Sequence, residues 1–168
     1  YFKQKGYSVC GVDPAQKPAE IANANGIFTI NNFFNINVAQ SIIEQFGQVD
    51  LVTSQNVLAH VENLISTFEN IYKILKIGGY FVFEIGYFKN VIETNCFDTI
   101  YHEHIDYHHA NPLVKILVSL GFDVINISEN NIQGGSLRLL LQKTGLGIVK
   151  KEPKIFLKNE KKSILYDN

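Results

Sequence analysis

Residues 97–107 carry a dense set of groups that can exchange protons. They read Phe-Asp-Thr-Ile-Tyr-His-Glu-His-Ile-Asp-Tyr and show neither a helical nor a strand period. The side chains that can transfer protons or donate hydrogen bonds are Tyr101, His102, Glu103, His104 and Tyr107. Groups this dense are costly to bury. The stretch therefore indicates an acid–base site or a metal site, and a polar loop with two surface histidines is the alternative.

A metal site would need ligands that converge on one point, with partners that orient them. The candidate ligands are His102, Glu103, His104, His108 and His109. Adjacent side chains such as His102 and Glu103 point apart in an extended segment, which argues against a shared metal ion. We therefore favour acid–base chemistry and predict no metal.

The segments that must position these residues alternate between short apolar strands and amphipathic helices. Strands are predicted at residues 8–12, 27–30, 51–54, 80–85, 123–127 and 136–142. Helices are predicted at residues 18–25, 38–46, 64–75 and 112–120. This order is typical of an α/β fold with a mostly parallel sheet covered on both faces. No helix separates the last two strands, so we predict that they form an antiparallel pair at one edge.

Open α/β sheets bind ligands at the carboxyl ends of their strands. Asp13 follows the first strand, where a carboxylate either accepts both hydroxyls of a ribose or hydrogen-bonds within a turn. Asn32 and Phe33 follow the second strand. They either offer an amide and a ring to an adenine, or form a turn with a phenylalanine in the core.

Two later strand ends also carry polar side chains. Gln55 and Asn56 directly follow the third strand, and His60 lies a little further on, where a packed or capping histidine is the alternative to a functional one. Glu84 falls at the end of the fourth strand among apolar residues, and we favour a hydrogen-bonded structural acid there.

Composition excludes several functional classes. The chain has 168 residues, 46% of them apolar and 18% charged, which suits one globular domain. Its net charge of −1 gives no reason to expect nucleic acid or an anionic membrane as a partner. We see neither an apolar run long enough to span a bilayer nor a signal peptide pattern. Cys10 and Cys96 are predicted to be buried free thiols, which fits a reducing cytoplasm.

The motifs together resemble the S-adenosylmethionine-dependent sugar C-methyltransferases, which act on nucleotide-linked 4-keto-deoxysugars. The resemblance covers roughly residues 1–143. It is carried by Gly11-Val12-Asp13-Pro14, Gln55-Asn56-Val57-Leu58-Ala59-His60-Val61, Tyr101-His102-Glu103-His104 with Tyr107, and Gly134-Gly135-Ser136-Leu137-Arg138. Many methyltransferases share the first motif, whereas the last two in this order are specific.

The resemblance implies a Rossmann-like class I methyltransferase sheet and a role for each matching residue. His104 matches the general base, and Tyr101, Glu103 and His60 match groups that assist it or hold the keto sugar. The cofactor S-adenosylmethionine is expected at Asp13, Asn32, Phe33 and Gln55. The nucleotide-sugar substrate is expected near Asn56 and Tyr107. The residues do not predict an oligomeric state.

The residue types suit this chemistry. A 4-keto group acidifies the neighbouring C3 proton, and an imidazole, with an ordinary pKa of about 6.5, is a suitable base. Donors such as Tyr101 or His60 would stabilise the enolate, each by roughly 3–4 kcal/mol in well-studied enzymes. The resulting carbanion would attack the sulfonium methyl group. An O- or N-methyltransferase acting on another small metabolite, and an inactive truncated fragment, are the alternatives.

The chain departs from the family pattern at both ends. The family's first strand, its glycine-rich loop and its N-terminal zinc module would all precede residue 1. We therefore expect a sheet that lacks its first strand, and low stability and weak cofactor binding for this chain alone. We expect residues 1–143 to form an N-terminally incomplete catalytic domain, and residues 144–168 to be a linker and the start of a second domain.

Overall fold

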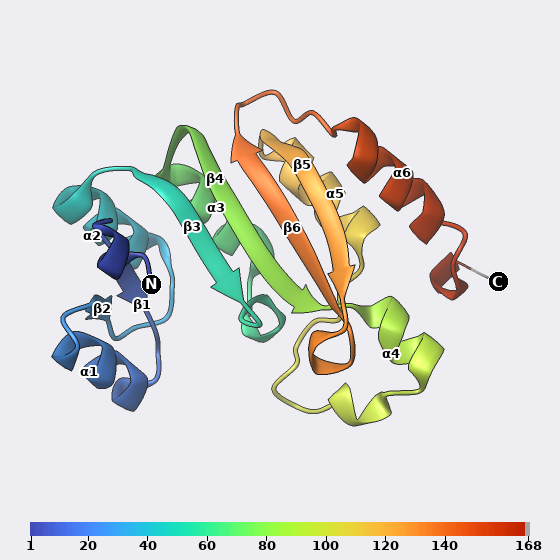
Figure 1. Ribbon diagram of the computed structural model, residues 1–168, viewed down its shortest axis with the longest axis horizontal. Coiled ribbons are helices and arrows are strands. Elements are labelled where there is room, and N and C mark those ends of the chain that lie inside the picture. Colours follow the sequence, from blue (N-terminus) through green and yellow to red (C-terminus); the bar gives the residue numbers. More distant parts are fainter. Residues whose placement is uncertain (167–168) are drawn as a thin grey trace. The chain divides into compact units, whose positions relative to one another are not determined.

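The structure is a computed structural model that describes residues 1–166, the side chain of residue 133 excepted. The chain divides into two compact units, Tyr1–Gln48 and Val49–Asn168 (Figure 1). Among the described residues, none of the helices is long and apolar enough to cross a membrane.

The first unit is a pair of parallel strands with two helices. β1 (Cys10–Val12) pairs with β2 (Phe28–Ile30), and the helices are α1 (Gln16–Ala24) and α2 (Ile36–Phe46). Asn35 caps α2, because its side-chain oxygen accepts hydrogen bonds from the first free backbone N–H groups of the helix. Gly11 lies opposite Thr29, and a Cβ at Gly11 would come within 2.7 Å of the Thr29 hydroxyl.

The second unit is built on a mixed sheet of four strands. Their spatial order is β3 (Val49–Gln55), β4 (Leu75–Gly86), β6 (Ser136–Lys143) and β5 (Phe122–Asn130). β3 is parallel to β4, whereas β6 is antiparallel to both of its neighbours. The centre of the sheet is apolar and buried, with Phe81, Phe83, Leu137, Leu139 and Leu141 at its core.

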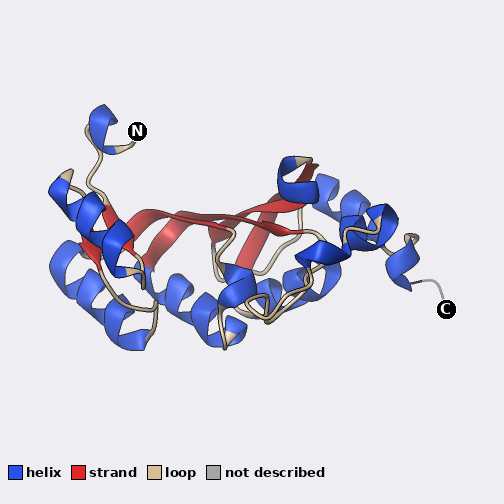
Figure 2. Cartoon of the chain, turned by 90° about the horizontal axis from the view of Figure 1, so that it is seen from below, coloured by secondary structure: helices blue, strands red, loops and turns tan. Residues whose placement is uncertain are grey.

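Helices α3 (Leu64–Ile74) and α5 (Ala110–Ser119) lie on the same side of this sheet, as Figures 1 and 2 show. Phe68 of α3 and Leu117 of α5 are fully buried. The short helix α4 (Phe88–Thr94) follows β4, and α6 (Lys151–Glu160) packs against β5 and α5. The buried phenylalanine rings of α3 and β4 contact one another and hold the helix on the sheet.

The α/β fold is confirmed, and all predicted strands and helices form with bounds displaced by a few residues. The antiparallel pairing of the last two strands is also confirmed, but β6 lies inside the sheet between β4 and β5. Helix α4 was not predicted, because its seven residues are too few to display a clear period. Helix α6 forms within residues 144–168, where we expected a linker and the start of a second domain and predicted no helix.

The two cysteines are free, as predicted, but they are only partly buried. Cys10 lies on the small two-stranded sheet, which has too few neighbours to enclose it, although the burial it has raises the pKa of its thiol. Cys96 lies in the turn between α4 and the short 3₁₀ helix Phe97–Thr99. The prediction of complete burial was therefore wrong.

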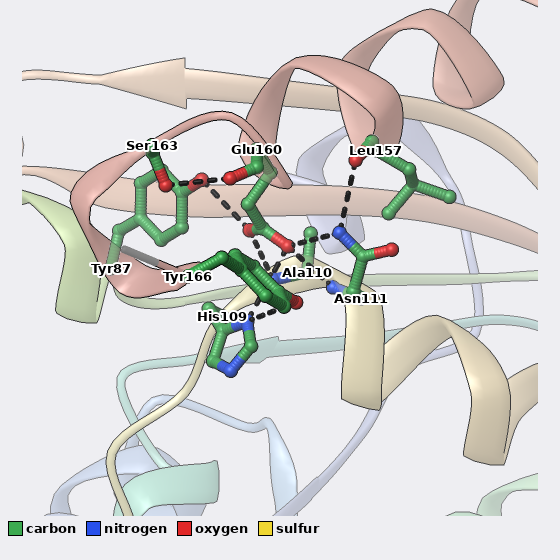
Figure 3. A network of polar contacts seen from close by, with 8 residues as sticks. All are labelled: Tyr87, His109, Ala110, Asn111, Leu157, Glu160, Ser163 and Tyr166. Carbon is green, nitrogen blue, oxygen red and sulfur yellow. Dashed lines mark hydrogen bonds and ion pairs between the residues drawn. The ribbon is translucent and has the colours of Figure 1, made fainter. Parts of the chain in front are cut away.

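The carboxylate of Glu160 joins the last helix to the centre of the second unit (Figure 3). Its Oε1 accepts from the Tyr87 hydroxyl at 2.8 Å and from the Ala110 backbone N–H at 2.6 Å. Its Oε2 accepts from the backbone and side-chain N–H groups of Asn111, at 2.7 and 2.6 Å. The carboxylate thus binds the free N–H groups at the start of α5 and, through Tyr87, the end of β4.

The surroundings of Glu160 favour its ionised form. Burial by itself would raise the pKa of the carboxyl, but the hydrogen bonds from Ala110, Asn111 and Tyr87 outweigh it and lower the pKa below the ordinary 4.5. The same burial and the adjacent carboxylate raise the pKa of the Tyr87 hydroxyl. The predicted boundary after residue 143 stays a prediction, but α6 is held by a buried polar contact rather than loosely attached.

Replacing Glu160 by alanine is expected to destabilise the protein by about 3 kcal/mol, because several buried donors lose their acceptor. The measurement is the free energy of unfolding in urea. The matched control is Glu152→Gln on the exposed side of the same helix, which should change stability by less than about 0.5 kcal/mol. Equal effects of the two substitutions would contradict the role given to Glu160.

The contribution of Glu160 should also depend on pH. The folded-state pKa lies below the unfolded value, so the unfolded chain binds the extra proton and stability falls as the pH drops below the ordinary value of 4.5. In Glu160→Gln this part of the acid dependence should be missing. The stability difference between the two proteins should be constant near neutral pH and shrink in acid, as followed by urea unfolding at a series of pH values.

Candidate functional site

The polar stretch 97–107 is a loop that lies on the short 3₁₀ helix Leu58–His60, just after β3. The backbone N–H of Ile105 donates to the Ala59 carbonyl at 2.8 Å, and the His60 ring donates from Nδ1 to the Glu103 carbonyl at 2.7 Å. These contacts bring together residues far apart in the sequence. The predicted residues that meet here are His60, Tyr101, His104 and Tyr107.

His104 is held at both ring nitrogens. Nδ1 lies 2.8 Å from the Thr99 carbonyl oxygen, and Nε2 lies 3.1 Å from the Tyr101 hydroxyl. A carbonyl is only an acceptor, so Nδ1 carries the hydrogen and the lone pair of the neutral ring is on Nε2. That lone pair faces a phenol that can donate to it, and the ring is half-buried rather than freely mobile.

The His60 ring lies beside His104, with centroids 4.9 Å apart. The same argument assigns its hydrogen to Nδ1, because that atom faces the Glu103 carbonyl. Neutral His60 therefore presents an acceptor at Nε2 and becomes a donor there only when it is protonated. Tyr101, unlike the Nε2 atoms of the two neutral rings, donates in its ordinary neutral form.

Tyr107 closes the other side of the cluster. Its ring meets His104 edge-on, with centroids 6.1 Å apart, and packs against Phe88 at the start of α4. Glu103 differs from the other predicted residues, because its carboxylate points to solvent. It lies 3.9 Å from His102 Nε2, and the two side chains are 64% and 90% exposed. Here the Thr99 carbonyl, rather than the Glu103 carboxylate, orients His104.

The paired ends of β3 and β4 come just before the turn that leads to His60. Gln55 is exposed at the end of β3, and Asn56 follows it with φ +53°, a conformation that asparagine tolerates better than most residues. The Asn56 backbone N–H donates to the Glu84 carbonyl at 2.9 Å. This bond extends the β3–β4 pairing to the point where the chain turns toward His60.

Glu84 is the hydrogen-bonded structural acid that we favoured. Its buried carboxylate accepts from Nε and Nη2 of Arg138, at 2.9 and 2.7 Å. Arg138 belongs to the Gly-Gly-Ser-Leu-Arg motif, for which the sequence alone predicted no role. The motif's second glycine, Gly135, has φ +119°, and a Cβ there would overlap the side chain of Asn90. The sequence feature that could have identified Arg138 as important was its place in this motif.

Three of the predicted cofactor residues lie together in the first unit. β1 and β2 are parallel and in register at Val12 and Ile30, so Asp13, Asn32 and Phe33 follow the same edge of the pair. Asp13 Oδ1 accepts from the Ala15 N–H at 2.8 Å, which is the turn hydrogen bond given as the alternative to ribose binding. Phe33 is 72% exposed, so it is not the core phenylalanine of the alternative interpretation. Asp13 and the exposed ring of Phe33 thus follow neighbouring parallel strands at one edge of this pair.

The tautomers of the two histidines give a direct test of this geometry. His60 and His104 are expected to carry their hydrogen on Nδ1 at neutral charge, because each Nδ1 faces a backbone carbonyl. Long-range ¹H–¹⁵N NMR spectra distinguish the tautomers, and the exposed His102 serves as an internal reference for a ring in exchange with water. A hydrogen on Nε2 of His104 would contradict the assignment of the lone pair.

Comparison with known proteins agrees with this architecture. The chain is 32% identical over 136 residues to the C-methyltransferase NovU of Streptomyces niveus, a match that covers 81% of this chain and about a third of that relative (32%). The fold is similar to that of the N-methyltransferase NodS of Bradyrhizobium japonicum WM9, with a TM-score of 0.54, 15% identity, and coverage of 80% of this chain and 72% of that one.

A second solved structure is magnesium protoporphyrin IX methyltransferase of Synechocystis PCC 6803 with bound S-adenosylhomocysteine. Its TM-score is 0.61 at 15% identity, covering 84% of this chain and 66% of that one. A family model described as a methyltransferase domain matches residues 1–127. The expected cofactor, S-adenosylmethionine, is supported by this match. On this evidence the chain belongs to the methyltransferase domain family.

Proposed function

We propose that this chain carries catalytic residues of an enzyme that transfers a methyl group from S-adenosylmethionine to C3 of a nucleotide-linked 4-keto-deoxysugar. The methyltransferase family assignment supports the general reaction. Two features favour a carbon acceptor: the similarity to a protein named as a C-methyltransferase, and the Tyr-His-Glu-His segment.

The observation that carries the proposal is that each ring nitrogen of His104 has its own hydrogen-bond partner. Its Nδ1 is fixed by the Thr99 carbonyl, and its Nε2 lone pair is accompanied by the Tyr101 hydroxyl at 3.1 Å. Removing a proton next to a ketone requires a base at the carbon and a donor at the ketone oxygen. The loop provides one of each, a hydrogen-bond length apart.

The steps follow from these positions. His104 Nε2 takes the C3 proton, and the electron pair of that C–H bond moves toward the keto oxygen. Tyr101, which donates to Nε2 in the absence of substrate, turns its O–H to the keto oxygen and stabilises the enolate charge. The imidazolium that forms keeps its Nδ1 bond to Thr99, so the ring does not have to move as it changes charge.

Three residues of the first unit are proposed to contact the methyl donor: Asp13 would accept hydrogen bonds from the ribose hydroxyls, with Asn32 and the exposed Phe33 ring at the adenine. Gln55, at the end of β3 in the second unit, is proposed as a cofactor contact on the family resemblance alone. When bound, S-adenosylmethionine supplies the methyl group that the C3 carbanion takes up. In the second unit, Asn56 and Tyr107 are proposed to hold the sugar, and Glu103 to bind a sugar hydroxyl from its exposed position.

Exchange at carbon tests this proposal directly. The full-length protein is incubated with a nucleotide-linked 4-keto-deoxysugar in deuterated water, without a methyl donor, and deuterium entry at C3 is followed by NMR. His104→Ala is expected to slow the exchange by about 10²–10⁴-fold, because it removes the base. Tyr101→Phe should slow it by about 10²-fold, because it removes the enolate donor.

The matched control is His102→Ala, a histidine two residues earlier whose side chain is 90% exposed. It should leave the exchange rate unchanged. If the folded, cofactor-binding wild-type protein exchanges no C3 hydrogen, the acceptor is not this ketone, and an oxygen or nitrogen acceptor is favoured instead. If exchange persists in His104→Ala, another residue is the base.

A further inference from the structure

Positive charge is concentrated on and around helix α6. Residues 150–162 hold six of the chain's 15 basic residues and two of its 16 acidic residues, which leaves nine basic and 14 acidic residues in the rest of the chain. The net charge of −1 therefore hides a strongly basic segment in an otherwise acidic chain. The proposed function above assigns no role to these lysines.

A cavity of about 290 Å³ lies beside this helix, and we refer to it as the α6 cavity. Three of the lysines line it. They are spaced at i, i+4 and i+7, so they share one face of α6 and its last turn. The other lining residues are one asparagine at the start of α5 and two apolar residues. The full lining is Asn111, Val149, Lys154, Leu157, Lys158 and Lys161.

The three lysines of the cavity have no carboxylate partner among residues 1–166. By contrast, Lys76 and Lys89 elsewhere in the second unit each form an ion pair. A row of lysines on a helix can simply be solvated, but here the side chains border one concave site, and the helical rise puts the first and last of them only about 10 Å apart. The cavity therefore gathers positive charge that no described carboxylate offsets.

The acidic groups of α6 itself do not cancel this charge. The Glu160 side chain does not line the cavity and has no exposed surface, because its oxygens accept hydrogen bonds from Tyr87 and the start of α5. The carbonyl oxygens at the end of the helix are also occupied. Leu157 O accepts from the Asn111 side chain, and Glu160 O accepts from the Ser163 hydroxyl.

The ligand that suits this lining is a small molecule with more than one negative charge. Lysine ammonium groups bind phosphate oxygens well, and three of them suit two linked phosphate groups better than a single carboxylate. Val149 and Leu157 offer an apolar wall to the rest of the molecule. A long polyanion such as RNA would also meet the acidic remainder of the chain. We propose that the α6 cavity binds the diphosphate group of a nucleotide.

Two sources could supply this group. One is the nucleotide part of the proposed nucleotide-linked substrate, and the other is a free nucleoside diphosphate. Binding itself requires neither methyl transfer nor a keto sugar, so the inference can hold where the proposed function fails.

Isothermal titration of the full-length protein with uridine diphosphate tests the inference. The nucleotide should bind with a dissociation constant of about 1 mM or below. Uridine has the same nucleoside without the phosphates and should give no saturable heat. Absence of saturable binding of the diphosphate, or equal binding of uridine, would overturn the proposal.

The lysines are tested by substitution. The double variant Lys154→Ala with Lys158→Ala should weaken binding by about tenfold or more, and it should keep α6, because alanine is a strong helix former. The matched control is Lys151→Ala with Lys162→Ala. It removes two charges from the same segment but outside the cavity, and should weaken binding less than about twofold. Equal losses in the two variants would show that the cavity is not the binding site.

The C3 exchange assay then separates the two sources. If the diphosphate belongs to the substrate, Lys154→Ala with Lys158→Ala should raise the concentration of nucleotide sugar needed for half-maximal exchange about tenfold, without changing the maximum rate. If the ligand is a separate nucleotide, that concentration should stay the same while the loss of uridine diphosphate binding remains. A protein that binds the nucleotide but exchanges no C3 hydrogen would contradict the proposed function and leave this inference standing.

Discussion

The second unit depends on a carboxylate that is buried deep inside it. Glu160 has its side chain fully buried, and it is held mainly by neutral donors: a phenol, two backbone N–H groups and an amide. These donors come from the end of β4 and the start of α5, which are the two points between which α4 and the polar stretch 97–107 extend. The Glu160 side chain of α6 therefore holds both ends of the segment that contains the loop. The loop itself is free to present its polar groups outward.

A second constraint applies to the candidate site. An imidazole ring needs a partner at one nitrogen, because that partner fixes which nitrogen carries the hydrogen and which carries the lone pair. In many enzymes that partner is a carboxylate. In this loop the partners of His60 and His104 are backbone carbonyls of the loop itself. The loop conformation and the tautomers are thus the same structural fact, because the turn that places His104 also points the Thr99 carbonyl at its ring.

Much of the architecture was predictable, because it depends on local periodicity. The strand ends at Asp13, Asn32 and Gln55 and the helix from residue 64 follow from apolar spacing and from turn residues. The inner position of β6 was not predictable, because strand order depends on long-range pairing that leaves no local trace. The buried role of Glu160 was not predictable either, because the lysine-rich segment around it has the composition of a solvent-exposed helix.

The candidate site was predictable by residue type and only partly by arrangement. The grouping of Tyr101 and His104 follows from their separation of three residues. The approach of His60 requires the loop to fold back on the chain after β3, and no spacing encodes that contact. The outward direction of Glu103 and the pairing of Glu84 with Arg138 likewise depend on tertiary packing. Sequence reasoning identified the chemical groups, whereas the fold decides which of them face one another.

The carbonyl anchors have a consequence for how this loop can diversify. Because the atoms that orient both histidines belong to the main chain, neither ring depends directly on the side chain of residue 99 or 103 for its hydrogen bond. A substitution of Glu103 would therefore change its proposed contact with the substrate without removing the backbone carbonyl that faces His60. Side chains of such a loop can change what the loop contacts while the two rings keep their orientation.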